Sequence, residues 1–209
     1  MNIEIKGLQK KDFNLARKFA IEGMGFSHYL ENKLLLYLYS KYIWYLELLR
    51  ATKTYCAYIG DKLVGFLLVD IKNKPKIYKS YMYKLYIKIT EWVMNKFYKD
   101  SNGTYNNVNK EMMDEFVKNK KPDGEIVFFA VDPEIKGKGI GTLLFNELSK
   151  DESGKIIYAY TDSNCNFQFY QKWGFIESGK KEIKMDLGNK NISLTCFLFS
   201  KVLENSGKK

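Results

Sequence analysis

Short strand-like runs and longer helical patterns alternate along the chain. Residues 3–5 alternate as in a short strand, and the next segment has apolar residues at helical spacing, at Phe13, Ala16, Phe19 and Ala20. A second helix is predicted over residues 32–50, where apolar residues lie on more than one face. We therefore expect this second helix to pack against the core.

Two runs rich in β-formers, TYCAYI and LVGFLLVDI, predict a hairpin. Gly60 and Asp61 between them tolerate tight-turn conformations. Farther along, the pattern predicts a buried strand over EIVFFAV (125–131), a helix over 142–150, a strand over 155–161, a short helix over 164–173 and two closing strands over 175–187 and 192–202. The fold class is therefore mixed α/β without an internal repeat, and residues 1–209 are predicted to form a single domain.

Residues 72–124 separate the third predicted strand from the fourth as a helical insertion. After Pro75, apolar residues recur every four positions, at Ile77, Tyr81, Leu85, Ile89, Val93 and Phe97. This stripe predicts a helix that packs over the rest of the fold, with Trp92 and several tyrosines inward. The stretch SNGTYNN (101–107) predicts a break, and a second helical pattern follows around 111–118.

Composition limits the classes of protein. The net charge is +10, and residues 72–123 supply +6 of it with twelve lysines against six acids. A basic helix of this kind is found on membrane surfaces, on nucleic acids and as an ordinary solvated face, and the solvated face is favoured. The most apolar stretch, 34–49, contains Lys41 and Glu47 and is too short to span a bilayer. With no signal peptide evident, a cytoplasmic protein is expected.

Cysteine and histidine are too few and too scattered for a metal site. The three cysteines form no CxxC pair, and His28 is the only histidine. Buried thiols in a reducing compartment are expected, without disulfides. Cys165 has no evident histidine partner, so a nucleophilic role is disfavoured.

Glycines at alternate positions, in VDPEIKGKGIGT (131–142), follow the predicted strand EIVFFAV. A turn from strand to helix exposes the first helical amides, whose dipoles favour an anion. Gly137, Gly139 and Gly141 remove Cβ atoms that would block a ligand from the backbone, and lysines add positive charge. The P-loop pattern is absent, and a dinucleotide fingerprint fails because Thr142 replaces its last glycine. A pyrophosphate cradle is the best interpretation.

This stretch resembles the acyl-coenzyme A motif of the GNAT N-acetyltransferase superfamily, an apolar strand, V-x-P, then Q/R-x-x-G-x-G/A. Lys136, Gly139 and Gly141 occupy the Q/R, G and G/A positions. A second stretch, TDSNCNFQFYQKWGF, resembles the later FYxxxGF segment of the family, with matches at Phe169, Tyr170, Gly174 and Phe175. The resemblance implies a central mixed, mostly antiparallel sheet of about seven strands flanked by helices.

The resemblance also implies a set of site residues. Acetyl-CoA is the implied co-substrate, bound by Phe129, Val131, Lys136, Gly137, Lys138, Gly139, Ile140, Gly141, Thr142 and Asn166. Ser163 stands at the position of the usual family asparagine, so Ser163, Asn164 and Asn166 all stay open for that role. Tyr170 matches the family's general acid, and Glu125 is a candidate to accept the amine proton or anchor the amine.

The implied function is transfer of an acetyl group from acetyl-CoA to a primary amine of a small molecule or protein by direct attack. The alternative is a non-catalytic module that binds CoA or a partner through the basic insertion. We expect no nucleic-acid partner, no metal and no stable membrane insertion. The acceptor and a homodimeric state stay open.

Overall fold

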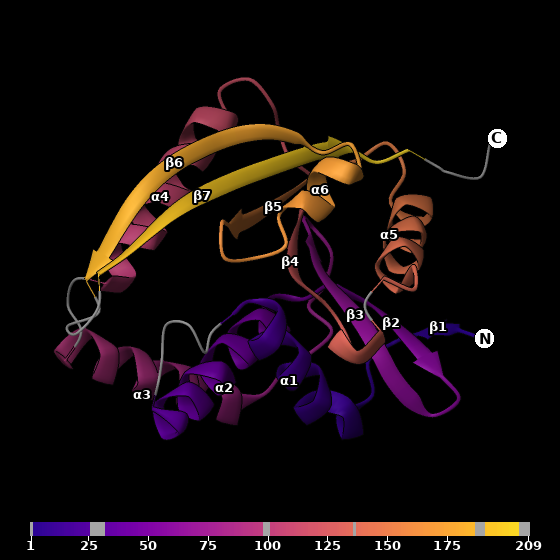
Figure 1. The fold of residues 1–209 in the computed structure, drawn as a ribbon, viewed down its shortest axis with the longest axis horizontal. Coiled ribbons are helices and arrows are strands. Elements are labelled where there is room, and N and C mark those ends of the chain that lie inside the picture. Colours follow the sequence, from indigo (N-terminus) through magenta and orange to yellow (C-terminus); the bar gives the residue numbers. More distant parts are fainter. Residues whose placement is uncertain (1, 26–31, 98–100, 136, 187–190, 205–209) are drawn as a thin grey trace.

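The structure, a computed structural model, describes residues 2–25, 32–97, 101–135, 137–186 and 191–204 (Figure 1). Seven strands form one sheet in the order β1-β2-β3-β4-β5-β7-β6. They are β1 (Glu4–Lys6), β2 (Lys53–Ile59), β3 (Lys62–Ile71), β4 (Gly124–Val131), β5 (Ile156–Asp162), β6 (Ile176–Asp186) and β7 (Asn191–Val202). Only β4 and β5 pair in parallel, so the predicted mixed, mostly antiparallel sheet is confirmed.

Helices cover both faces of the sheet. They are α1 (Phe13–Gly23), α2 (Lys33–Arg50), α3 (Tyr81–Phe97), α4 (Ser101–Phe116), α5 (Ile140–Asp151) and α6 (Gln168–Lys172), with 3-10 turns at Lys10–Asp12 and Pro133–Ile135. The first two pack on one face of β2 to β4, around the buried Trp44 and Leu48. Helix α5 packs on the opposite face through Leu144 and Leu148. The part of the sheet formed by β2 to β4 therefore lies between two hydrophobic cores.

Strands β4 and β5 are paired only at one end. Their pairing consists of Gly124 with Ile157 and Glu125 with Tyr158. Beyond these pairs the two strands separate, so the rest of β4 faces a gap in the sheet instead of a neighbouring strand. An interrupted parallel pair leaves main-chain donors and acceptors of β4 available to a ligand.

A β-bulge at Val127 alters the direction of side chains along β4. Leu68 pairs with Phe128 and Val69 pairs with Ile126, which leaves Val127 as the extra residue. Val127 and Phe128 consequently pack on the same core, beneath α1 and α2, while Phe129 returns to the core beneath α5. The bulge falls on the part of β4 that faces the gap.

The predicted orientation of the stripe in residues 77–97 is wrong. Tyr81 is 79% exposed, and Ile77, Leu85, Ile89 and Val93, the other stripe residues whose side chains are described, are also exposed. Trp92, beside the stripe, is 61% exposed. Instead, α3 contacts α2 through its opposite side, where Tyr83 stacks on Tyr45 with ring centroids 4.0 Å apart. The stacking of Tyr83 on Tyr45 of α2 determines which side of α3 faces the protein. The four-residue period alone does not reveal this side.

The predicted break at 101–107 is also wrong, because α4 begins at Ser101. Its side chains Met112 and Phe116 are buried against β6 and β7, the two long strands that curve along α4 in Figure 1. Burial of this face outweighs the low helix propensity of Ser, Asn and Gly.

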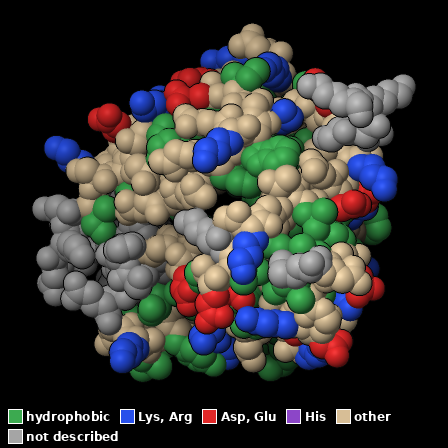
Figure 2. All heavy atoms as spheres, turned by 45° about the vertical axis from the view of Figure 1, so that its right-hand side comes forward, with side chains coloured by type: hydrophobic (Ala, Val, Ile, Leu, Met, Phe, Trp, Pro, Cys, Tyr) green, Lys and Arg blue, Asp and Glu red, His purple; other side chains and the backbone are tan. Residues whose placement is uncertain are grey.

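The surface carries mixed charge. Figure 2, which turns the right-hand side of Figure 1 forward, shows Lys and Arg side chains scattered among hydrophobic and acidic ones. Among the described residues, no helix is both long and apolar enough to cross a bilayer.

Candidate active site

A cleft of about 800 Å³ opens where β4 and β5 separate. Its walls come from the part of β4 beyond Glu125, from the glycine loop before α5, from the end of β5 and from α6, with the end of α1 and Tyr105 of α4 at its sides. Of the predicted cofactor-binding residues, it is lined by Phe129, Val131, Gly137, Gly139, Ile140, Gly141, Thr142 and Asn166. The cleft is therefore the place where the two sequence motifs meet.

The glycine loop needs glycine for its backbone conformation. Gly137 has φ 88° and Gly139 has φ 79°, both in the left-handed region that L side chains rarely adopt. A Cβ atom at either position would meet no protein atom within 4 Å, so the space beside the loop is open to a ligand. No side chain caps α5, whose N-cap is Gly139. The first amides of the helix are thus exposed where an anion would be stabilised.

Gly141 joins the two motifs by close packing. A Cβ atom there would lie 3.1 Å from Cε2 of Phe169 and 3.3 Å from Cζ of Phe129. The two phenylalanine rings meet edge to face, with centroids 4.8 Å apart. Glycine therefore lets α6, the start of α5 and β4 approach one another around the cleft.

Tyr170 lines the same cleft from α6. Its ring stacks on Phe199 and meets Phe175 edge to face, with centroids 5.8 Å and 5.2 Å away. Burial raises the pKa of its phenol above the ordinary value. The hydroxyl is consequently protonated at neutral pH and chemically suited to donate a proton or hydrogen bond into the cleft.

Two predicted site residues, Lys138 and Glu125, lie outside the cleft lining. Lys138 is exposed and does not line the cleft, and Lys136 falls outside the described residues. Glu125 is buried at the closed end of the gap, where β4 and β5 still pair. Its carboxylate accepts hydrogen bonds from Arg50 of α2 and, at 2.8 Å, from the hydroxyl of Tyr158.

Arg50 links Glu125 to a second carboxylate. It donates to Glu47, one helical turn earlier, at 2.9 Å. Burial raises the pKa of Glu47 to about 7, although Arg50 opposes that shift. The sequence contains the Glu47–Arg50 spacing, but nothing in it indicated that Glu125 would join the pair, because the contact depends on how α2 crosses β4.

Asp162 is a cleft residue that no sequence motif indicated. It is only 7% exposed, and burial raises the pKa of its carboxyl. Its oxygens accept hydrogen bonds from the N–H of Asn164 at 2.8 Å and the hydroxyl of Tyr105 at 3.5 Å. In the sequence, the polar run TDSN (161–164) at the end of a predicted strand was the pattern that could have indicated Asp162.

The three candidates for the asparagine role differ in position. Asn164 and Asn166 line the cleft, whereas the hydroxyl of Ser163 accepts a hydrogen bond from the N–H of Thr195 at 3.2 Å. Cys165 also lines the cleft, and burial raises the pKa of its thiol to about 12. A protonated thiol is a poor nucleophile. Within the described part of the chain, no group of three or more His, Cys, Asp or Glu residues could hold a metal ion.

Comparisons with known proteins agree with this geometry. A family model described as the acetyltransferase (GNAT) family matches residues 24–175. No curated protein sequence matches the chain. Among solved structures, the fold is similar to a GNAT-family protein from Desulfovibrio desulfuricans, with TM-score 0.52, 12% identity and coverage of 97% of this chain and 99% of that one.

Two further solved structures share the fold at similarly low identity. One is a histone acetyltransferase HPA2 and related acetyltransferase from Corynebacterium glutamicum, with TM-score 0.52, 14% identity and coverage of 94% and 96%. The other is the ribosomal-protein-S18-alanine N-acetyltransferase of Escherichia coli, with TM-score 0.50, 11% identity and coverage of 100% and 98%.

Proposed function

The chain belongs to the GNAT acetyltransferase family, and on that premise we propose that it transfers an acetyl group from acetyl-CoA to a primary amine by direct attack. One observation carries the proposal. The glycine loop and Tyr170, which come from separate motifs, line one cleft beside the unpaired part of β4. This arrangement brings an anion cradle and a proton donor to the same space.

The described residues fit acetyl-CoA. Open space beside Gly137 and Gly139 and the uncapped start of α5 suit a pyrophosphate. Main-chain groups of Phe129 and Val131 are suited to hold the pantetheine arm, and Asn166 is the asparagine we assign to the cofactor. Lys136 and Lys138 add screened positive charge at the loop. Bound acetyl-CoA supplies the activated thioester.

Proton transfer is assigned to two side chains. Tyr170 donates a proton to the departing thiolate, because its phenol stays protonated at neutral pH. Glu125 accepts the proton of the attacking amine, directly or through water, or anchors that amine. Asp162 is the rival acceptor, since it lines the cleft and burial raises its pKa. Donors on β4 stabilise the oxyanion that develops during attack.

The amine acceptor is a small molecule or a protein amino group, and neither nucleic acid nor a metal takes part in the reaction. A homodimer is compatible with this scheme but is not required by it, because both assigned proton-transfer residues lie within one chain. The competing function is a module that binds CoA or a partner through the insertion 72–124 without turnover.

The test combines binding with turnover. CoA and acetyl-CoA are titrated by calorimetry, and free thiol release is then followed with a panel of polyamines, amino sugars, amino acids and peptides with free N-termini. Thiol release that depends on one amine class supports the proposal. Tight CoA binding with no release across the panel supports the module instead. Absence of CoA binding contradicts the transferase and the CoA-binding module, and leaves only a module that binds a partner.

A further inference from the structure

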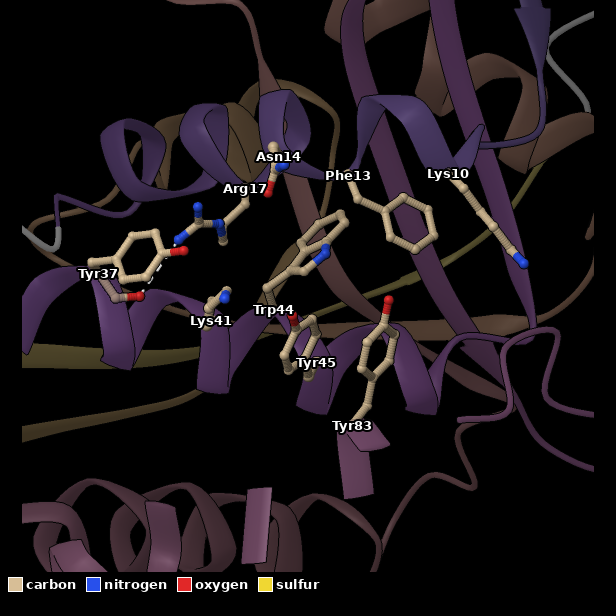
Figure 3. A pocket seen from close by; sticks show the side chains of 9 residues that line it. All are labelled: Lys10, Phe13, Asn14, Arg17, Tyr37, Lys41, Trp44, Tyr45 and Tyr83. Carbon is tan, nitrogen blue, oxygen red and sulfur yellow. Dashed lines mark hydrogen bonds between the residues drawn. The ribbon is translucent and has the colours of Figure 1, made fainter. Parts of the chain in front are cut away.

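A second pocket, of about 340 Å³, lies between α1, α2 and α3 (Figure 3). It shares no lining residue with the cleft beside β4. The nine described residues that line it include Lys10, Arg17 and Lys41 but no Asp or Glu. A concave site with three cations and no acid attracts anions. Its volume is near the lower end of ligand pockets, about 300 to 1,000 Å³, so it suits a small molecule.

Arg17 is held in place by the protein. Its Nη1 donates to Oγ of Ser40 at 2.9 Å and to the carbonyl of Tyr37 at 3.4 Å, shown by the dashed line in Figure 3. The guanidinium also lies over the Tyr37 ring, 4.6 Å from its centroid, and Lys41 Nζ lies 5.0 Å from that centroid. Two cations gathered on one tyrosine are thus oriented before any ligand arrives, which lowers the entropic cost of binding.

The indole N–H of Trp44 lacks a partner. Trp44 is only 2% exposed, and its Nε1 is one of two buried side-chain polar atoms, among the described residues, without a hydrogen bond. A buried donor without an acceptor costs about 1 to 3 kcal/mol. In Figure 3 this nitrogen and the hydroxyl of Tyr83 point toward the same space, beside the ring of Phe13. An acceptor atom of a ligand would relieve that cost once a small side-chain shift let it reach the covered N–H.

Aromatic rings and Asn14 make up the rest of the wall. Tyr45 and Tyr83 stack with centroids 4.0 Å apart and planes 7° apart, and Phe13 meets Trp44 edge to face at 5.9 Å. Rings of this kind bind a flat apolar body, whereas cations alone would bind any anion. The lining therefore favours a ligand that carries both a negative charge and a flat apolar ring.

We propose that this pocket binds a small aryl anion, a carboxylate or phosphate on a planar ring, separately from the acetyl-transfer site. Arg17 and Lys41 bind the anionic group, Trp44 donates its indole N–H to it, and the aromatic wall covers the ring. The proposal is independent of the transferase activity, because it involves none of the residues assigned to that reaction.

The indole N–H of Trp44 is also the reporter for the test. The chain has three tryptophans, so the ¹⁵N-labelled protein gives three indole signals. The Trp92→Phe and Trp173→Phe variants identify the Trp44 signal by elimination. Indole-3-carboxylate, benzoate and phenyl phosphate are titrated to about 10 mM, a range that covers Kd values near 1 mM. Indole-3-carboxamide, benzamide and inorganic phosphate are the matched probes that lack either the charge or the ring.

The expected result is a saturable shift of the Trp44 signal with the aryl anions. The affinity should be at least about tenfold weaker for the neutral amides and for phosphate alone. Lys41→Met weakens binding, whereas Lys18→Met, an exposed lysine of α1 outside the pocket, does not. Thermal melts confirm that each variant is folded. Equal binding of charged and neutral probes, equal affinity in the two variants, or no saturable shift overturns the proposal.

Discussion

Gly141 and Phe169 contact each other across the candidate active site, so close that a Cβ atom on Gly141 would lie 3.1 Å from the Phe169 ring. One residue belongs to the glycine motif and the other to the FYxxxGF segment. Position 141 therefore needs a small residue because a larger side chain would collide with the Phe169 ring, and not because the backbone there needs glycine. The two motifs are therefore linked by packing as well as by the ligand they are proposed to share.

The first prediction tests this contact. Gly141→Val overpacks the junction with Phe169 and Phe129 and lowers the free energy of unfolding by about 1 to 3 kcal/mol, together with CoA affinity. Denaturant melts and calorimetry measure both quantities. The double variant Gly141→Ala/Phe169→Leu should recover most of the stability lost by Gly141→Ala alone. Strict additivity of the two single substitutions would contradict direct coupling.

A second prediction separates strain from ligand blockage in the loop. Gly139 and Gly154 have similar φ angles, 79° and 84°, and a Cβ atom at either meets no protein atom within 4 Å. Alanine at each position should lower stability by a similar amount, about 1 kcal/mol. Only Gly139→Ala should weaken CoA binding, because Gly154 lies outside the cleft lining. An equal affinity loss in both variants would exclude a cradle at Gly139.

The third prediction concerns Tyr170. Tyr170→Phe keeps the ring that packs on Phe199 and Phe175 but removes the hydroxyl, so kcat should fall by about 100-fold while CoA affinity is unchanged. Tyr160→Phe is the matched control, since that hydroxyl donates to the carbonyl of Asn109. The control should reduce stability more than turnover. Parallel loss of CoA affinity and kcat in Tyr170→Phe would make the hydroxyl a binding group.

Local patterns predicted the parts of the fold and site that depend on local physics. The hairpin around Gly60, the glycine loop and the strand that precedes it follow from turn chemistry and periodicity, and the cleft is lined where those motifs predicted. The outward orientation of Trp92, the helix at residues 101–107 and the Arg50–Glu125 pair depend on contacts between distant segments. A single helical period cannot reveal which side of α3 finds a partner, and no spacing connects residue 50 to residue 125.

The fourth prediction distinguishes Glu125 as proton acceptor from Glu125 as support for Arg50. If the carboxylate takes the amine proton, Glu125→Gln lowers kcat by about 100-fold and removes the acidic limb of the pH profile of kcat/KM. Arg50→Met then lowers stability but retains that limb. If both variants retain the limb and Asp162→Asn removes it, Asp162 is the acceptor. Burial raises the pKa of Asp162, so the limb would lie above the ordinary pKa of an aspartate.

The last prediction concerns acid stability and Glu152, a carboxylate only 1% exposed at the end of α5. Lys74 and Lys53 contact it at 2.6 Å and 2.9 Å, and Lys155 completes the group. Burial alone would raise its pKa, but the hydrogen bonds from these lysines outweigh burial and lower the pKa to about 2. A depressed pKa means that the folded state holds the proton less tightly than the unfolded chain, whose value is near 4.5.

The stabilisation by Glu152 is therefore present above about pH 4.5 and is lost as the pH falls through the folded pKa near 2. Glu152→Gln should lower the free energy of unfolding at pH 7 by about 2 kcal/mol, allowing for screening of the partly exposed lysines, and should flatten its decline below pH 4.5. The control is Glu134→Gln, because the Glu134 side chain is 80% exposed and lies 3.6 Å from Lys62. This variant should change the free energy of unfolding by less than about 0.5 kcal/mol. Urea melts from pH 3 to 7, the lower limit set by acid unfolding, measure both variants. An unchanged pH slope in Glu152→Gln would show that the lysines stabilise the fold without depending on this carboxylate.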